Sequence, residues 1–180
     1  MKLKLVDGFK IRNTVDVDFG GIGCKKLFPY VPDNEVWLDD IFKGEKDLFV
    51  DMYKKIMASM AQNGYEGAKA QFKTNYEFNV DKVYDLSGFY IVDGEYVRNN
   101  INRAFKYGGH YVVYDYIPEG EIWIDDKVNR DEMKYIFKHE ATELKLMRDK
   151  DFQYNDAHDF ANAHEKKMRR AYIGAKYPRD

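Results

Sequence analysis

Apolar and polar residues alternate in two short segments of the chain, residues 35–40 and residues 121–126. In the second segment Ile122 and Ile124 fall on one side of an extended chain, and the intervening Trp123 falls on the other side with its acidic neighbours. A proline precedes each segment and indicates a turn into it. The pattern therefore predicts one strand in each segment.

After each predicted strand the apolar residues recur at helical spacing. In the second half Asn129 is placed to cap a helix with Glu132 at its third position, and another helix is predicted over about residues 155–172. In the first half a long helix is predicted, with a short helix after Gly64. The apolar positions of the two long helices are Leu48, Met52, Ile56 and Met60 in the first half, and Met133, Ile136, Phe137, Leu144 and Met147 in the second.

The two strand segments belong to a longer internal repeat. Residues 30–40 resemble residues 116–126, and each of the two segments contains one of the two tryptophans of the chain. A match of this length indicates an internal duplication. The matching positions upstream are Phe19 with Phe105 and Gly23 with Gly109. Further upstream Gly8 is matched with Gly88, because each of these two glycines begins a Gly-Phe-x-Ile sequence.

The elements and the repeat together predict an α+β protein with two homologous halves, a degenerate N-terminal repeat over residues 1–80 and a C-terminal repeat over residues 81–180. Each half is expected to form a small antiparallel sheet followed by a helix pair. Residues 73–86 are expected to form an extended connector or an additional strand. Since no Pro-rich or Ser-rich linker separates the halves, we expect them to share one core.

Composition and charge narrow the classes of partner. Hydrophobic residues at 44% and charged residues at 33% are typical of globular proteins, and an aromatic content of 16% favours packed sheets. The 29 basic and 31 acidic residues leave a net charge of −2, so no positive excess favours nucleic acid. No apolar run approaches the ~20 residues that cross a bilayer, and Cys24 is the only cysteine. We therefore expect no membrane partner and a reducing, cytoplasmic location.

All four histidines lie in the second half, and two of them lie near acidic residues at helical spacing. On the first helix of this half, His139 and Glu143 are four residues apart and share a face, so that an imidazole and a carboxylate can hold one ion. Glu140 falls in the middle of the apolar stripe, where a carboxylate needs a proton, a cation or a metal. The four histidines are His110, His139, His158 and His164.

The second helix adds further candidates to this site. His158 and Glu165 are seven residues apart and lie on nearly the same edge, so two adjacent helices can close a site. In the first half the aligned positions of His139, Glu140 and Glu143 are Tyr53, Lys54 and Met57. A lysine cannot share a metal cavity, which predicts one site per chain and leaves the first half as a scaffold or a docking surface.

Each of these features also has a simpler interpretation. His-Glu-x-x-Glu strings are often solvated helix faces, His164 on a small-residue face fits a core histidine, and His110 fits a turn residue before a strand. The repeated tryptophans and tyrosines are interpreted as core and turn anchors. The basic tail over residues 169–180 is interpreted as a solvated helix end, with a contact for an acidic partner as the alternative.

The second half contains His139-Glu140-x-x-Glu143-x-x-Leu146-Met147, followed by Tyr154-x-x-Ala157-His158-x-x-Ala161-x-x-x-Glu165. These motifs come after Gly108-Gly-His110 and the strand sequence Ile117-Pro-x-x-Glu-Ile-Trp-Ile-Asp125. With these residues the second half resembles a group of phage and prophage proteins with a zincin-like, metallopeptidase-related signature. The resemblance covers residues 105–170 and extends to the N-terminal half only through the internal repeat. It implies a zincin-like helix pair behind a small sheet, an origin in a mobile element and an inferred catalytic role.

Ordinary zincins have His-Glu-x-x-His, and this chain has Glu143 at the last position of that motif. His139, Glu143 and His158 remain an acceptable zinc set with one position open for water, and Glu140 is then the candidate general base. Glu140 and Glu143 are also able to exchange these roles. The residues expected to orient the ligands are Glu165, His164 and His110.

Two functions of different classes follow from this pattern. The first is a zinc-dependent hydrolase that acts on a peptide bond, with a protein or peptide as its partner. The second is a non-catalytic phage structural or protein-interaction module, in which the polar cluster is a hydrogen-bonded network that fixes the packing of two helices. If the chain is phage-encoded, its location is the host cytoplasm or the virion.

Overall fold

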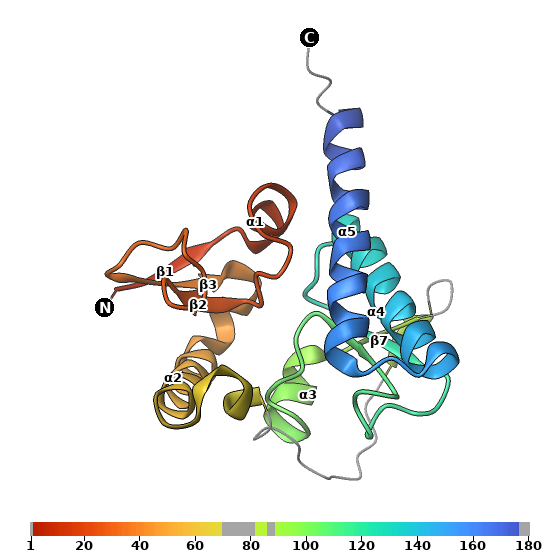
Figure 1. Cartoon of the computed structure of the whole chain (residues 1–180), viewed down its shortest axis with the longest axis horizontal. Helices are drawn as coiled ribbons and strands as arrows, with labels where there is room; N and C mark the ends of the chain where they lie inside the picture. The colour runs from red at the N-terminus through yellow and green to blue at the C-terminus, as the bar shows by residue number, and fades with distance from the viewer. Residues whose placement is uncertain (1, 70–81, 86–88, 177–180) are drawn as a thin grey trace.

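The computed structural model describes residues 2–69, 82–85 and 89–176. It is a mixed α+β structure in which the two halves lie side by side (Figure 1). In the first half β3 is the central strand, with β1 parallel to it on one side and β2 antiparallel on the other. The elements of this half are β1 (Lys2–Val6), α1 (Gly8–Thr14), β2 (Ile22–Cys24), β3 (Glu35–Asp39), the 3₁₀ segment η1 (Asp40–Glu45) and α2 (Lys46–Lys69).

The second half repeats this order of strands and helices without the 3₁₀ segment, and adds a strand before them and a helix after them. Its central strand is β7, with β5 parallel to it and β6 antiparallel, and β4 pairs with β5 at the edge of the sheet. The elements are β4 (Lys82–Asp85), β5 (Tyr90–Val92), α3 (Gly94–Asn100), β6 (Gly108–His110), β7 (Ile122–Asp125), α4 (Arg130–Lys150) and α5 (Tyr154–Lys176).

The sheets are mixed, so the expectation of antiparallel sheets is wrong. β1 reaches β3 through a long connection that contains α1 and β2, and such a crossover allows two adjacent strands to run parallel. The connection from β5 to β7 through α3 and β6 has the same result. The local alternation of residues predicted strands but carried no information on their direction.

The predicted correspondence between Gly8 and Gly88 is also wrong. Gly8 opens α1 after the cap residue Asp7, and the residue that opens α3 in the same way is Gly94, after Asp93. A Cβ at Gly8 would lie 1.8 Å from a carboxylate oxygen of Asp39, which only a glycine avoids. The corresponding clash at Gly94 is with the Asp125 carboxyl group. Gly88 lies outside the described residues.

The first half has one long helix where a helix pair was expected. α2 continues through Gly64 to Lys69, since a glycine inside a helix costs only about 1 kcal/mol relative to alanine and no proline follows it. Of the expected connector or strand over residues 73–86, β4 forms the strand part. Residues 70–81 lie outside the described part of the chain, so the boundary between residues 80 and 81 stays a prediction.

The buried apolar residues form separate clusters within each half, so the expectation of one shared core is wrong. In the first half the cluster lies between the sheet and α2, and includes Leu38 and Phe49. In the second half one cluster lies under α4 and another lies around Trp123. Tyr107 packs against both the first-half cluster and the cluster under α4.

Buried ion pairs connect the halves where apolar contacts were expected. Arg12 of α1 pairs with Asp39 of its own half at 2.8 Å and with Glu132 of α4 at 2.5 Å. Arg98 of α3 pairs in the same way with Asp125 of its own half, and with Glu45 of the first half at 2.7 Å. Among the described residues, each half therefore supplies one buried arginine to a buried carboxylate of the other half.

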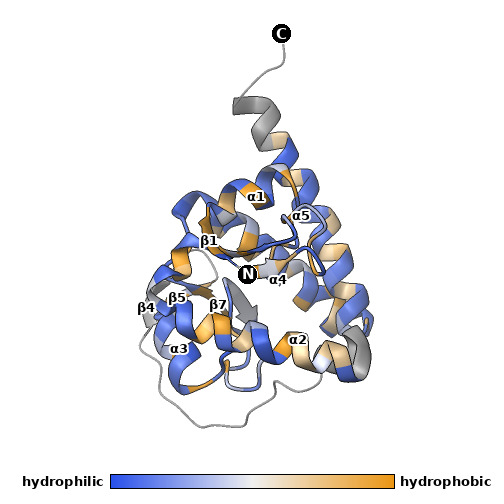
Figure 2. Cartoon of the chain, turned by 90° about the vertical axis from the view of Figure 1, so that its left-hand side faces the viewer, coloured by the Kyte–Doolittle hydropathy of each residue, from blue (hydrophilic) through white to orange (hydrophobic). Residues whose placement is uncertain are grey.

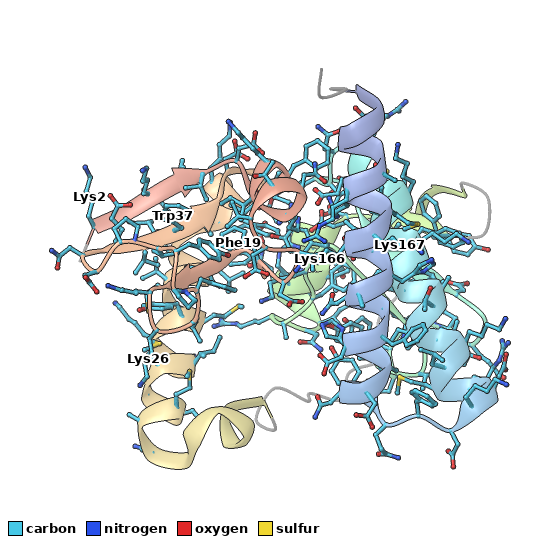
Figure 3. All side chains as sticks on the ribbon, turned by 45° about the horizontal axis from the view of Figure 1, so that its top comes forward. Lys2, Phe19, Lys26, Trp37, Lys166 and Lys167 are labelled. Carbon is cyan, nitrogen blue, oxygen red and sulfur yellow. The ribbon has the colours of Figure 1, made fainter. Side chains whose placement is uncertain are left out.

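Two further views show how hydropathy and side chains are distributed over these elements (Figures 2 and 3). The helices labelled in Figure 2 mix hydrophilic and hydrophobic positions, and within the described residues no helix is long and apolar enough to cross a membrane. In Figure 3, Lys2 lies at the end of the first half that is remote from α5, whereas Phe19 lies on the side that faces it. Phe19 is 1% exposed, and its ring packs against Phe28 of the same half.

Candidate metal centre

The helix that carries most of the site begins as the sequence predicted. The side chain of Asn129 caps α4 by accepting a hydrogen bond from the backbone N–H of Asp131 at 2.9 Å. One face of α4 packs on the second sheet through Met133 and Ile136. This packing fixes the helix on the sheet and leaves the side that carries His139 to face α5.

α5 packs closely along α4 because it presents small residues there. Ala157 and Ala161 are four residues apart and fully buried, so the two helix backbones can approach each other. The turn between the helices is short, and Asp151 adopts the left-handed conformation that ends α4. These features place His158 and Glu165 of α5 against the ligand-type residues of α4.

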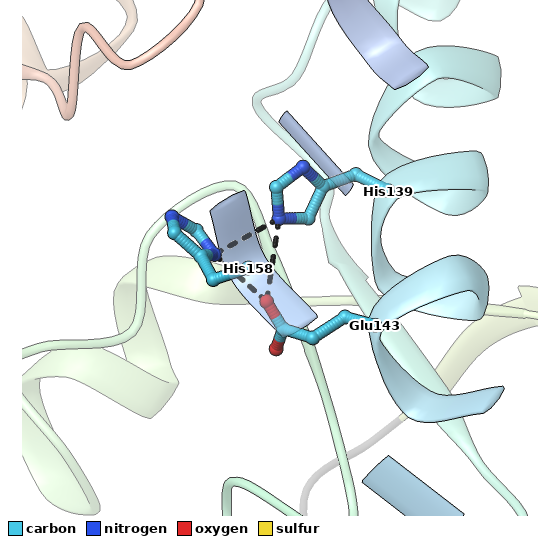
Figure 4. Close-up of side chains that lie close together, drawn as sticks. All are labelled: His139, Glu143 and His158. Carbon is cyan, nitrogen blue, oxygen red and sulfur yellow. Dashed lines mark hydrogen bonds and ion pairs between the residues drawn. The ribbon is translucent and has the colours of Figure 1, made fainter. Parts of the chain in front are cut away.

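Three ligand-type atoms converge between α4 and α5 (Figure 4). His158 Nδ1 lies 2.7 Å from Glu143 Oε2 and 3.1 Å from His139 Nε2, and His139 Nε2 lies 3.5 Å from the same Glu143 oxygen. A tetrahedral metal ion with bonds of about 2.0–2.1 Å holds its ligand atoms about 3.3 Å apart. The three distances therefore fit one small ion bound by all three side chains.

The other ring nitrogen of His139, Nδ1, is hydrogen-bonded to Glu165. His139 Nδ1 lies 2.9 Å from Glu165 Oε2, so that the Nδ1–H donates to this carboxylate. When the ring is neutral, this hydrogen bond keeps the proton on Nδ1 and leaves the lone pair on Nε2. Glu165 is 5% exposed and His139 is 8% exposed, which shields this hydrogen bond from water. A carboxylate behind a ligating histidine is a usual feature of zinc sites.

Glu143 also contacts a histidine on the sheet side. Its Oε1 lies 3.0 Å from Nε2 of His110, the last residue of β6. His110 is fully buried, and within the described part of the chain its Nδ1 has no hydrogen-bond partner. Together with Glu140, these two residues form a second group with metal-ligand spacing, which shares Glu143 with the first.

The pKa values show how the cluster is balanced without a metal. Burial alone would raise the pKa of Glu143, but hydrogen bonds with His110, His139 and His158 hold it well below its ordinary value. Burial alone would lower the pKa of His139, but Glu143 and Glu165 raise it to about 10. A proton therefore occupies His139 between two carboxylates, and a bound metal ion would have to replace it.

Glu140 has the opposite balance. Burial, followed by the nearby carboxylates Glu143 and Glu165, raises its pKa to about 8, against a lowering effect of His139. Among the described residues, none donates a hydrogen bond to it. Glu140 is therefore a half-buried carboxyl group that changes charge near neutral pH in the metal-free protein.

The site opens toward solvent at His158. The side chain of His158 is 36% exposed, and the Tyr154 ring stacks on it with the ring centroids 5.3 Å apart. The first half approaches this side of the site through Asp18. Burial and Asp16 raise the pKa of Asp18, whereas His158 and His139 lower it.

The chain was compared with models of protein families, with curated proteins and with solved structures. None of them matches it. The functional argument therefore depends on the geometry of the site and on the chemistry of its side chains.

The structure brings together most of the residues that the sequence singled out. His139, Glu143 and His158 form one group, Glu165 contacts His139, and His110 contacts Glu143. His110 is the last residue of a buried strand, and not a turn residue.

His164 was expected in the core, or as an orienting residue, and this expectation is wrong. It lies on the exposed side of α5, because the adjacent Glu165 takes the inward position. Within the described residues, no hydrogen bond or ion pair of His164 is found.

The helical wheel misplaced the burial of α4. It put Glu140 in the middle of the buried face and His139 and Glu143 at its edge, yet Glu143 is 2% exposed and His139 is 8% exposed, whereas Glu140 is only half-buried. The reason is that α4 is covered on two sides, by the sheet and by α5, and the wheel considered one apolar face.

Sequence reasoning missed three charged residues near the site. Arg169 was interpreted as part of a solvated tail, but it is 1% exposed and bonds to Glu165 and Glu132. Arg12 and Glu132 are equally buried partners of each other. The spacing of Glu165 and Arg169, four residues apart on one helix, was the signal that could have indicated the first of these contacts.

Proposed function

We propose that the protein is a zinc-dependent, zincin-like hydrolase with one metal site per chain, formed by His139, Glu143 and His158. The observation that carries this proposal is the convergence of two imidazole nitrogens and one carboxylate oxygen, at the spacing of ligand atoms around one tetrahedral ion. Two nitrogen ligands and one oxygen ligand form a donor set that suits zinc.

The chemistry of such a site follows from its open position. Three protein ligands leave the fourth position of a tetrahedral zinc ion to water, and zinc lowers the pKa of a bound water to about 7. The half-exposed side of the site at His158 supports access by water and by a substrate. The resemblance to metallopeptidase-related phage proteins favours a peptide bond as the substrate and a mobile element as the origin of the chain.

Glu140 is the proposed general base, and Glu143 is the proposed metal ligand. The reverse assignment is less favourable, because Glu143 reaches both His139 and His158, whereas Glu140 groups with His110. A carboxyl group whose pKa is raised to about 8 by burial suits proton transfer at neutral pH. His110 and Glu165 then orient Glu143 and His139 by hydrogen bonds.

We also propose that the two halves arose by duplication and that the first half lost the site or never had one. The support is the same strand order and the same pairing directions in both sheets, together with the repeated arginine and aspartate pairs. At the positions of His139 and His110 the first half has Tyr53 and Cys24, which share a hydrogen bond. Tyr53 and Cys24 thus replace one proposed ligand, His139, and one proposed orienting residue, His110.

A second function is supported by one observation. The imidazoles and carboxylates are already bonded to one another, as a helix-pairing network in a non-catalytic phage structural or protein-interaction module would be. In that case the protein would keep its fold and bind a protein partner without a metal.

The two functions are separated by metal content. Elemental analysis by mass spectrometry after zinc loading and dialysis should give about one zinc per chain for wild type, and far less for His139→Ala and His158→Ala. His164→Ala is the matched control, since it removes an exposed imidazole from the same helix and should retain zinc. Wild type without zinc under these conditions would exclude the hydrolase and leave the interaction module.

Activity is tested separately with a mixed peptide library. Zinc-loaded wild type should cleave peptides that Glu140→Gln does not cleave, although this variant should retain zinc. Cleavage at the wild-type rate by Glu140→Gln would contradict its role as the base. If Glu140→Gln also lost zinc, Glu140 would be a ligand, and the roles of the two glutamates would have to be exchanged.

A further inference from the structure

A chain of buried charges leads from the candidate metal centre into the other half of the protein. Its first link is the Glu165 carboxylate, which accepts from His139 Nδ1 through Oε2 at 2.9 Å. The other oxygen of Glu165 accepts from Arg169 Nε at 2.7 Å. The position of the Glu165 carboxylate therefore depends on the position of the Arg169 guanidinium group.

The chain continues from α5 to α4 and then to α1. Arg169 donates to Glu132 Oε1 at 2.9 Å, and the same carboxylate accepts from Arg12 at both oxygens, at 2.5 and 2.9 Å. In Figure 1 the helix that carries Arg12, α1, lies beside α5. No member of this chain, from Arg12 to His139, is more than 8% exposed.

The first half holds Arg169 by a second contact as well. Asn13, the residue after Arg12 on α1, accepts from Arg169 through its side-chain oxygen at 2.9 Å. Besides Glu165, Arg169 thus donates to two groups. One is Glu132, which is itself bound by Arg12, and the other is Asn13. Since buried charges interact strongly and salt screens them much less than exposed charges, a change at Arg12 should be transmitted to Glu165.

The direction of the effect can be derived from charge. With Arg12 present, Glu132 shares its negative charge between two guanidinium groups. When the bidentate contact of Arg12 is lost, Glu132 attracts Arg169 more strongly, and Arg169 holds Glu165 less. Glu165 then loses the partner that orients it toward the Nδ1–H of His139. The hydrogen bond between Glu165 and this N–H favours the neutral ring tautomer that has its free lone pair on Nε2, so this tautomer is favoured less.

We propose that Arg12 is a positioning residue for the metal centre, through which the N-terminal half orients the ligand His139 by way of Glu132, Arg169 and Glu165. This inference rests on the proposed metal site. It assigns to the half without ligands a role in the chemistry of the half that has them.

The repeat supplies a matched control for this inference. Arg98 makes the same two kinds of contact as Arg12, with Asp125 of its own half and with Glu45 of the other half. Glu45 has Lys127 as its further partner, at 3.3 Å, and among the described residues no histidine continues this second network. Arg98→Lys therefore weakens the contact between the halves as Arg12→Lys does, without reaching His139.

The first test compares zinc affinity, measured by competition with a chelating dye, in wild type, Arg12→Lys and Arg98→Lys. Loss of an outer partner of a ligating histidine lowers metal affinity by about 10- to 100-fold. Arg12 acts three links beyond the outer partner Glu165, so Arg12→Lys is expected to lose affinity at the low end of this range, about tenfold. Arg98→Lys is expected to stay within about twofold of wild type, although thermal unfolding should show that both variants lose stability. Equal affinities for the two variants would overturn the inference.

The second test reports on His139 itself and needs no metal. Nitrogen-15 chemical shifts of the His139 ring should change in Arg12→Lys and stay at wild-type values in Arg98→Lys. Asn13→Ala is a milder variant that keeps both arginines, and it should change the same shifts in the same direction; its control is the exposed Asn99→Ala. Unchanged His139 shifts in Arg12→Lys would overturn the inference.

The two tests keep the inference distinct from the proposed function. If wild type binds zinc and the two arginine variants bind it equally well, the metal site stands and the role of Arg12 fails. If wild type binds no zinc, the proposed function fails, and with it the role of Arg12 at a metal centre, even if the His139 shifts respond.

Discussion

Replacing Glu165 by glutamine should weaken zinc binding without removing a ligand. The wild-type carboxylate accepts from His139 Nδ1 at 2.9 Å, and both groups are buried. An amide at this position is uncharged, and it can present its NH₂ group to the ring instead of an acceptor. The tautomer with a free Nε2 lone pair is then no longer favoured, and the metal loses part of the basicity of its ligand.

The magnitude follows from the position of Glu165 directly behind a ligand. Loss of such an outer partner lowers metal affinity by about 10- to 100-fold, which corresponds to about 1.4–2.7 kcal/mol. Glu165 also pairs with Arg169, so part of this loss reflects a small rearrangement of the buried network. The effect should remain smaller than that of His139→Ala, which removes a ligand and should abolish stoichiometric binding.

Zinc dissociation constants are measured by competition with a chelating dye, and circular dichroism checks the fold of each variant. Glu119→Gln is the control, because it makes the same chemical change at an exposed position between β6 and β7, a segment that carries none of the proposed ligands. The reasoning would be refuted if Glu165→Gln bound zinc as tightly as Glu119→Gln.

Three other predictions concern the contact between the halves and the packing of the site. Glu45→Ala should lower the free energy of unfolding by about 3–5 kcal/mol in urea titrations, because it leaves the buried Arg98 with one partner fewer; the half-exposed Glu95→Ala should cost less than about 1 kcal/mol. Burial alone would raise the pKa of Glu45, but Arg98 lowers it below its ordinary value, so this stabilisation should be complete above about pH 4.3 and lost as the pH falls through the folded-state pKa. Unfolding midpoints of wild type between pH 7 and 3 should show this loss, and a Glu45→Ala variant with the same acid dependence would contradict it. Ala157→Leu should lower the free energy of unfolding by about 1–3 kcal/mol and weaken zinc binding, because the larger side chain forces α4 and α5 apart. The same change at the exposed Ala163 is the control and should have neither effect. Unchanged zinc affinity in Ala157→Leu would show that the site does not require close helix packing.

Local patterns predicted the elements that carry the site. Alternation over residues 121–126 predicted β7, Asn129 was recognised as the cap of α4, and the helix expected over about residues 155–172 is α5. These features depend on neighbours in sequence, such as the period of apolar residues and a side chain that accepts from its own helix. They are therefore accessible without knowledge of the tertiary structure.

The convergence of the ligand-type residues was predictable for the same reason. Residues four apart on a helix share a face, which brings His139 and Glu143 together, and the seven-residue spacing of His158 and Glu165 places both on one edge of α5. What the spacing could not give is which face α5 covers. That depends on the short turn at Asp151 and on the small residues of α5, and it decides that Glu143 and not Glu140 is central.

The contacts between the halves could not be predicted from local patterns. Arg12 and Glu132 are 120 residues apart, and nothing in the neighbourhood of either one indicates a buried partner. The repeat did contain a signal, because Arg12 and Arg98 recur at the same offset as the tryptophans. Their correspondence was not recognised, since the alignment paired Gly8 with Gly88 and so broke the register in this region.

Anomalous diffraction at the zinc absorption edge, from crystals of the zinc-loaded protein, tests the central claim most directly. The account predicts one anomalous peak per chain, bonded to His139 Nε2, His158 Nδ1 and a Glu143 oxygen, with His139 Nδ1 still against Glu165. A peak bound elsewhere, such as at His110 with Glu140, or no peak between α4 and α5, would contradict the proposed metal centre.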